Sequence, residues 1–299
     1  MLSVKNIEKW YGNLKAVDNI SFEVNEGEIF GLLGLNGAGK TTTFRMIMGL
    51  LDDYNGEITL SSKKIDYSIT DKIGFLTEER SLLMKMRVDN QIKYYAILKG
   101  MKESVIEKRM DYWLSRFGLM DCKYKKIKEL SKGNQQKIQF ITAIIHEPKL
   151  LILDEPFSGL DPINVELFKE VILELKKKKT IIIFSSHRME HVELFCEKLL
   201  ILVKGKCVLE GNIKDIKRDF KSKNIIVAGQ FDIDKVSNIN GVKEIINNKD
   251  YYVIKIIDDS IVPLVFNVIK KSKNITKFMV EDPSLNEIFI AKVGEAYEE

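Results

Sequence analysis

The residues most suited to chemistry lie near the start of the chain, in a glycine-rich run that ends in a lysine and two threonines. The run reads Gly34-Leu35-Asn36-Gly37-Ala38-Gly39-Lys40-Thr41-Thr42. Its glycines let the backbone curl so that N–H groups point at phosphate oxygens. Lys40 would neutralise the outer phosphates of a ligand, and the Thr41 hydroxyl could ligate Mg²⁺. We expect seven consecutive residues to belong to the binding site for this phosphate ligand: Asn36, Gly37, Ala38, Gly39, Lys40, Thr41 and Thr42.

The surroundings of this run distinguish a P-loop from a simple glycine-rich turn. The apolar run 29–33 precedes it as a strand, and the apolar segment 44–48 follows it as part of a helix. Strand, glycine-rich loop and helix in this order are the context that a P-loop requires. The positive end of the helix, near Lys40, would add to the attraction for phosphate. The context therefore favours the P-loop.

A second candidate group is a pair of carboxylates, Asp154 and Glu155, at the end of the apolar strand 150–153. In P-loop enzymes the acidic residue at such a place holds Mg²⁺ directly or through water, and Asp154 fits that role. Glu155 would face the γ-phosphate, where a carboxylate can activate water as a general base. Taken alone, an Asp-Glu pair after a strand is more often a turn. Its position downstream of a P-loop favours the catalytic interpretation.

Length and composition restrict the class of protein. The chain has 299 residues, 45% of them hydrophobic, which predicts one large or two ordinary domains. Its formal net charge of +4 creates no strong field for nucleic acid. Three cysteines without C-x-x-C spacing indicate reduced thiols in a cytosolic protein. No apolar stretch approaches the roughly 20 residues that span a bilayer, so spanning helices would come from another polypeptide.

The elements that must position these residues alternate between strand and helix. Apolar runs predict strands at 2–11, 20–24, 29–33, 56–60, 73–76, 150–153, 180–185 and 198–203. Helical spacing predicts helices after the P-loop and at 88–118, 134–146, 163–178 and 189–196. This alternation is typical of a parallel α/β core.

Beyond Gly211 the pattern changes to short elements in the order β-α-β-β-α-β. The predicted strands are 224–229, 242–247, 250–257 and 275–280, and the predicted helices are 232–238, 262–271 and 284–293. This order predicts a small ferredoxin-like α+β domain. We therefore expect an α/β domain at 1–211, with a helical subdomain at about 78–146, and a C-terminal α+β domain at 212–299.

Four further motifs resemble those of the ABC ATPases and occur in that family's order. They are the signature Leu130-Ser131-Lys132-Gly133-Asn134-Gln135-Gln136-Lys137, the D-loop Ser158-Gly159-Leu160-Asp161, the switch histidine of Ser185-Ser186-His187, and Tyr11, which resembles the aromatic residue that stacks on adenine. Together with the P-loop they make the resemblance very specific over residues 1–211. It implies a P-loop NTPase fold, ATP and Mg²⁺ as cofactors, and ATP hydrolysis as the activity.

The resemblance also implies an ATP site shared by two subunits. The signature begins a helix, so Ser131 and the backbone of Gly133 can offer donors to an anion. Because one chain already holds phosphate with its own P-loop, the signature would contact the γ-phosphate of a second subunit. A head-to-tail homodimer follows, with Asp161 at the ATP site and His187 on the γ-phosphate. Without the neighbouring motifs, His187 would be interpreted as an ordinary histidine at the end of a strand.

Two departures from the family pattern stand out. The signature has Lys132 in place of a glycine and Asn134 in place of a glutamine. The segment Thr77-Glu78-Glu79-Arg80 has Glu78 where the family usually has a glutamine that touches Mg²⁺ and signals to the membrane subunit. Glutamate keeps an oxygen ligand but adds negative charge. The Glu-Glu-Arg form and the tail 281–289 resemble the sodium-efflux (NatA-like) branch of exporter subunits.

The leading hypothesis is therefore the ATP-hydrolysing subunit of a membrane exporter. It would lie peripherally at the cytoplasmic face of the cell membrane and use the surface from about Glu78 to Gly118 to meet a separately encoded permease. The alternative is a soluble ABC ATPase acting on nucleic acid or ribosomes. Residues 212–299 carry 14 Lys/Arg and 14 Asp/Glu, so the basic footprint of nucleic-acid binding is missing and none is expected. The added domain is a packing or dimer-stabilising module, or alternatively a ligand sensor.

Overall fold

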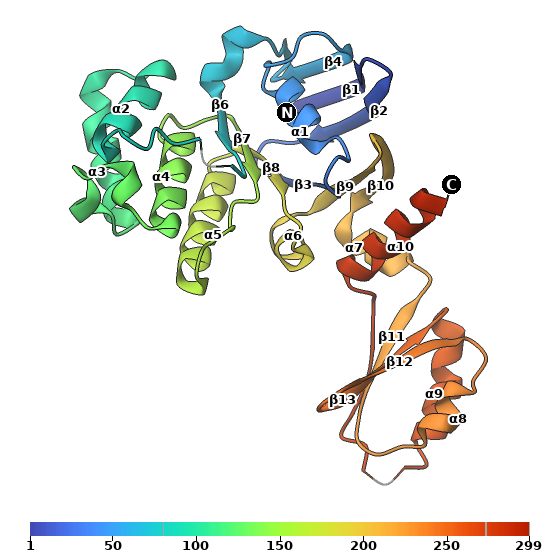
Figure 1. Cartoon of the computed structure of the whole chain (residues 1–299). Coiled ribbons are helices and arrows are strands. Elements are labelled where there is room, and N and C mark those ends of the chain that lie inside the picture. The colour runs from blue at the N-terminus through green and yellow to red at the C-terminus, as the bar shows by residue number, and fades with distance from the viewer. Residues whose placement is uncertain (80, 273, 299) are drawn as a thin grey trace. The chain divides into compact units, whose positions relative to one another are not determined.

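The computed structural model describes residues 1–79, 81–272 and 274–298, which form two compact units, Met1–Glu210 and Gly211–Glu299 (Figure 1). Arg80, part of the Glu-Glu-Arg form noted above, lies outside the described residues. Within the described ranges, no helix is long and apolar enough to cross a membrane.

The centre of the first unit is a six-stranded sheet in the order β10-β9-β3-β8-β7-β6. Its strands are β3 (Ile29–Gly34), β6 (Ile73–Leu76), β7 (Leu150–Asp154), β8 (Ile181–Ser185), β9 (Lys198–Val203) and β10 (Lys206–Asn212). The pairs β3–β8, β3–β9, β6–β7 and β7–β8 are parallel, which confirms the predicted α/β core. The sequence analysis missed β10, because this edge strand is half polar and has no apolar run.

A second, antiparallel sheet covers one face of this core and has the order β2-β1-β4-β5. Its strands are β1 (Leu2–Tyr11), β2 (Leu14–Val24), β4 (Asn55–Leu60) and β5 (Lys63–Lys64). The second strand begins earlier than the predicted 20–24, because the hairpin pairs Tyr11 with Leu14. Helix α1 (Lys40–Ile47) contributes buried side chains to the same core as β1, β3 and β8.

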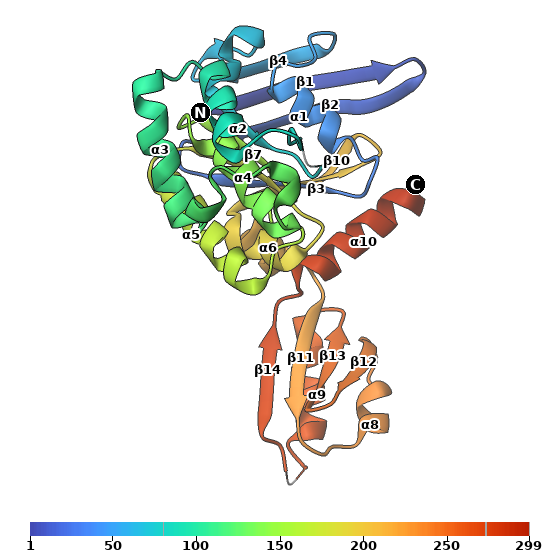
Figure 2. The ribbon, with the colours of Figure 1, turned by 60° about the vertical axis from the view of Figure 1, so that its left-hand side comes forward.

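Further helices pack around the parallel sheet: α2 (Val88–Leu98), α3 (Glu103–Arg116), α4 (Lys132–Ile144), α5 (Pro162–Lys177) and α6 (Met189–Phe195). Of these, α2, α3 and α4 form a helical cluster beside β6, drawn in green in Figures 1 and 2. The predicted helical stretch 88–118 is divided in two, because Gly100 adopts a left-handed conformation with φ 76° that no helix accommodates.

The second unit contains the predicted ferredoxin-like arrangement. Its strands are β11 (Lys223–Ala228), β12 (Val242–Asn248), β13 (Tyr251–Ile256) and β14 (Lys277–Glu281), and its helices are α7 (Ile213–Asp219), α8 (Ile233–Ser237), α9 (Val262–Ile269) and α10 (Leu285–Glu298). The sheet order is β12-β13-β11-β14, and its pairs are antiparallel. Helices α8 and α9 share one buried core with the sheet, on one of its faces (Figure 2). The sequence analysis did not predict α7.

Candidate nucleotide-binding site

The candidate site residues follow four neighbouring parallel strands. The P-loop follows β3, and His187 follows β8. Asp154 is the last residue of β7, Glu155 comes directly after it, and Glu78 follows β6. The registers align these ends, since Asp154 pairs with Ser185 across β7 and β8. In open parallel sheets, ligands bind at the carboxyl ends of the strands. The fold therefore brings residues that are far apart in sequence to one edge of the sheet.

The P-loop glycines are required for two different reasons. Gly34 and Gly39 are surrounded by backbone: an added Cβ would lie 2.6 Å from the Leu202 carbonyl oxygen and 2.5 Å from that of Ala16, respectively. Gly37 has open space around it, but its φ of 79° is a conformation that side chains rarely adopt. The loop thus needs its glycines for close approach at both ends and for backbone shape in the middle.

Lys40 is the first residue of α1, and its ammonium group reaches back over the loop. The Lys40 Nζ donates to the carbonyl oxygens of Gly34 at 2.6 Å and Leu35 at 3.2 Å. Burial lowers the pKa of Lys40, while the nearby carboxylates of Asp154, Glu155 and Glu78 oppose that shift. A cation held by loop carbonyls and facing three carboxylates is suited to a phosphate accompanied by a divalent metal.

Asp154 and Thr41 could provide hard oxygen ligands for Mg²⁺. Asp154 is 8% exposed, and burial raises the pKa of its carboxyl group. The Ser185 Oγ donates to Asp154 Oδ1 at 2.7 Å, which favours the charged form. Among the described residues, no group of three His, Cys, Asp or Glu side chains could hold a metal ion by itself. The residues fit Mg²⁺ that is shared with nucleotide phosphates, because this ion commonly uses few protein ligands.

Glu155 and His187 form a direct pair. The His187 Nδ1 lies 3.0 Å from Glu155 Oε2, and the His187 backbone N–H donates to Glu155 Oε1 at 2.5 Å. The Ser186 Oγ also donates to Oε2, at 3.1 Å. Glu155 has a left-handed backbone with φ 50°, and such strain concentrates at functional sites. The pair presents an oriented carboxylate beside a histidine whose side chain is 76% exposed.

The signature residues lie at the beginning of α4, next to the D-loop. Ser131 is the N-cap of α4, and its Oγ accepts from the Asn134 N–H at 3.3 Å. A Cβ on Gly133 would lie 3.7 Å from the Gly159 carbonyl oxygen. Within the described part of the chain, no hydrogen bond joins Ser131 to the P-loop. The fold therefore leaves the signature outside its own chain's phosphate loop.

Asp161 and Tyr11 have local structural contacts of their own. Asp161 is the N-cap of α5 and accepts from the Asn164 N–H at 3.0 Å, which lowers the pKa of its carboxyl group. Tyr11 ends β1, is 45% exposed, and has the Lys9 ammonium 5.2 Å from its ring centre. These contacts leave the Tyr11 ring accessible, whereas capping alone would account for an aspartate at position 161.

Three residues in and beside the site were not singled out from the sequence. Ser185 donates a hydrogen bond to the Asp154 carboxylate, and Ser186 donates one to the Glu155 carboxylate. Gln139 on α4 donates to backbone carbonyl oxygens on both sides of Glu78. The two serines stand next to His187 in the sequence, so adjacency to a motif could have indicated them. Gln139 has no such signal, because it lies 62 residues from its partner Thr77.

Comparisons with known proteins give a family match for each of the two units. The sequence profile of the family described as "ABC transporter" matches residues 17–158, and that described as "ATP-binding protein DrrA1-3-like, C-terminal domain" matches residues 211–293. A profile described as "AAA domain, putative AbiEii toxin, Type IV TA system" matches residues 125–192.

Individual relatives agree with these matches. The chain is 49% identical to the uncharacterized ABC transporter ATP-binding protein YhaQ of Bacillus subtilis, over 100% of both chains. It is 33% identical to the ABC transporter ATP-binding protein NatA of Bacillus subtilis, over 71% of this chain and 88% of NatA. Among solved structures, it resembles a bacterial ABC transporter cassette described as dimeric, with TM-score 0.65 and 25% identity over 71% of this chain and 99% of the cassette.

Proposed function

The chain belongs to the ATP-binding proteins of ABC transporters, which hydrolyse ATP, and from this premise we propose that it powers a separate membrane permease as a head-to-tail homodimer. The observation that carries the proposal is the position of Ser131. It stands at the N-terminus of α4 without a hydrogen bond to the P-loop in the described part of its own chain. A helix N-terminus attracts anions, so a second subunit's γ-phosphate is a fitting ligand.

In this dimer each residue of the site has one task. Lys40 and the P-loop backbone bind the ATP phosphates, and Tyr11 stacks on adenine. Glu155 accepts the proton of the attacking water, while His187, oriented by Glu155, contacts the γ-phosphate. Asp161, in the D-loop, belongs to the ATP-binding residues.

We propose that the metal ligands belong to the same site. Thr41, Asp154 and Glu78 would hold Mg²⁺, which when bound neutralises phosphate charge. Ser185 holds the Asp154 carboxylate in place for this task.

Ser131→Arg tests the shared site. We expect the variant to bind ATP as a monomer with near wild-type affinity, because the phosphate that Ser131 contacts belongs to the other subunit. Dimerisation and steady-state turnover should be lost, since the larger side chain and its charge occupy the interface. A fluorescent ATP analogue measures binding, and gel filtration with ATP measures dimerisation. Ser131→Ala is the matched control: it loses the same cap hydrogen bond, worth about 1 kcal/mol, without the added bulk. Loss of ATP binding by the Ser131→Arg monomer would contradict the shared site.

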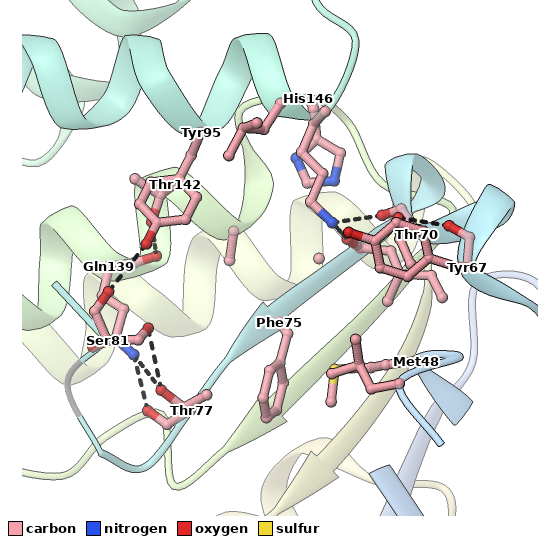
Figure 3. A pocket seen from close by; sticks show the side chains of 16 residues that line it. Met48, Tyr67, Thr70, Phe75, Thr77, Ser81, Tyr95, Gln139, Thr142 and His146 are labelled. Atoms are coloured by element: carbon pink, nitrogen blue, oxygen red, sulfur yellow. Dashed lines mark hydrogen bonds between the residues drawn. The ribbon is translucent and has the colours of Figure 1, made fainter. Parts of the chain in front are cut away.

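A pocket beside Glu78 is the proposed docking place for the permease. Its volume is about 450 Å³, and it lies between the sheet core and the helical cluster, with Phe75 on one side and Tyr95 on the other (Figure 3). Tyr67 and Leu98 also line it and are 76% and 61% exposed. An exposed apolar rim around a pocket is typical of a protein interaction site.

The pocket also carries a positive charge. The Lys99 Nζ donates to the carbonyl oxygens of Thr70 at 2.5 Å and Ile73 at 2.9 Å, and burial lowers the pKa of Lys99. Burial together with Lys99 lowers the pKa of His146 to about 4, so this imidazole is neutral at neutral pH. An amphipathic permease segment with a polar or acidic group suits such a surface.

Glu78→Gln tests the link between this pocket and the ATP site. At a few ångströms, attraction of Glu78 to Mg²⁺ and repulsion from phosphate each amount to several kcal/mol, about the same size at an effective dielectric near 20. We therefore expect ATP binding to persist and basal ATPase activity to change only several-fold. Stimulation by the permease should change more, because Thr77 and Ser81, on either side of Glu78 in the sequence, line the pocket. Complete loss of ATPase activity without the permease would instead make Glu78 a primary catalytic group.

We further propose export as the direction and the cytoplasmic face of the membrane as the location. The supports are the similarity to NatA over 71% of the chain and the match of residues 211–293 to the DrrA-like C-terminal domain. The soluble alternative, acting on nucleic acid or ribosomes, gains no support from these relatives. Reconstitution with a candidate permease in sealed vesicles, with ATP on one side, tests both export and membrane association.

A further inference from the structure

We propose that Gln139 is a positioning residue, which holds the Glu78 loop against the signature helix and so sets where the Glu78 carboxylate stands. The inference rests on the proposed function, because it assumes that Glu78 acts at the Mg²⁺-ATP site. It adds a residue to which neither the motifs nor the comparisons assign a role.

The contacts of Gln139 converge on the backbone around Glu78. The Gln139 Nε2 donates to Thr77 Oγ1 at 2.8 Å, to the Thr77 carbonyl oxygen at 3.1 Å and to the Glu79 carbonyl oxygen at 3.4 Å. Figure 3 shows the Gln139 amide pointing at the Thr77 side of the loop. One amide group thus binds the chain immediately before and immediately after Glu78.

Glu78 depends on these contacts because its own side chain is not anchored. Glu78 is exposed, and among the described residues its carboxylate makes no hydrogen bond or ion pair. Its charge nevertheless acts on both Lys40 and Asp154, so it lies near the metal and phosphate positions. The place of the carboxylate is therefore determined by the backbone that Gln139 holds.

The burial of Gln139 argues against a role in packing alone. Gln139 is 2% exposed, and its Oε1 is buried without a hydrogen-bond partner among the residues that the structure describes. An unpaired buried acceptor is unfavourable, and an apolar side chain of similar size would fill the space without it. The Gln139 amide therefore lowers the stability of the fold. Its presence is expected if its N–H groups have a functional role.

The same helix connects this contact to the signature. Ser131 caps α4, and Gln139 lies eight residues later, about 12 Å along the helix axis. The intervening residues from Gln135 onward are buried, so the helix is held along its length. In the proposed dimer, Gln139 would therefore link the Glu78 loop of one ATP site to the signature at the other.

Gln139→Met tests the proposal, because methionine keeps the length and removes the donor. The readout is the affinity for a fluorescent ATP analogue, measured with Mg²⁺ and again with EDTA, so that it does not depend on turnover. Residues that orient metal ligands typically contribute about tenfold to metal affinity. We expect Gln139→Met to reduce the Mg²⁺-dependent gain in affinity about tenfold and to leave binding in EDTA unchanged.

A double-mutant cycle with Glu78→Ala separates positioning from general stability. If Gln139 acts through Glu78, Gln139→Met should have little further effect in the Glu78→Ala background. Gln91→Met is the matched control, since Gln91 is also a fully buried glutamine of the helical cluster and bonds to the Leu83 N–H instead.

Three outcomes would overturn the inference: additive effects in the cycle, an equal loss of affinity in EDTA, or the same Mg²⁺ effect in Gln91→Met. Each of them would leave the proposed function standing if Ser131→Arg still blocks the dimer.

Discussion

Glu155→Gln is expected to bind ATP normally, to hydrolyse it at least about a hundredfold more slowly than wild type, and to accumulate as an ATP-bound dimer. The rate expectation follows from the size of general-base contributions. The two carboxylates of this strand end have separate tasks, because Asp154 is buried and held by Ser185, whereas Glu155 faces His187. Glutamine keeps the shape of the side chain but cannot accept the proton of the attacking water.

Single-turnover hydrolysis and gel filtration in the presence of ATP are the measurements for this variant. Glu190→Gln is the matched control, because it removes an exposed carboxylate from the neighbouring helix α6. Wild-type turnover in Glu155→Gln would remove Glu155 from the role of base. Slow turnover without a stable dimer would leave the base in place and contradict the proposed ATP-bound dimer.

Lys40→Ala should lose most of its affinity for ATP. A hydrogen bond to a charged group contributes about 1.5–3 kcal/mol, so losing one or two such bonds predicts at least about a tenfold to hundredfold weaker complex. The structure also indicates that Lys40→Ala weakens ATP binding rather than the stability of the fold. Among the described residues, the Lys40 Nζ donates only to the carbonyl oxygens of Gly34 and Leu35, and the bond to Leu35 is exposed to solvent.

Titration with a fluorescent ATP analogue measures this loss, and thermal unfolding without nucleotide monitors the fold. Arg45→Ala is a suitable control, because Arg45 is an exposed cation in the last turn of the same helix α1. Equal affinity in Lys40→Ala and wild type would show that Lys40 does not bind the phosphates. A large loss of stability without nucleotide would assign Lys40 a structural role in the loop.

The fold class was predictable because its signals are local. The alternation of apolar runs and helical spacing led to the parallel α/β core, and the β-α-β-β-α-β order led to the ferredoxin-like unit, and both are confirmed. The failures also have local causes. The break at Gly100 is a single left-handed residue inside a continuous helical pattern, and β10 is a half-polar edge strand that forms only because β9 lies beside it.

For the site, residue types and spacing by themselves pointed to the P-loop and to the pair Asp154 and Glu155, and the resemblance to the ABC ATPases added the signature and His187. Spacing can do so because each motif is a short segment with its own geometry. Only the tertiary structure decided which of them meet: Glu155 with His187, Asp154 with Ser185, and Gln139 with Thr77. The members of each pair are 31 to 62 residues apart in the sequence, and no local sequence pattern predicts such contacts. The register of the parallel strands β7 and β8 brings the first two pairs together, whereas the packing of helix α4 against β6 brings Gln139 to Thr77.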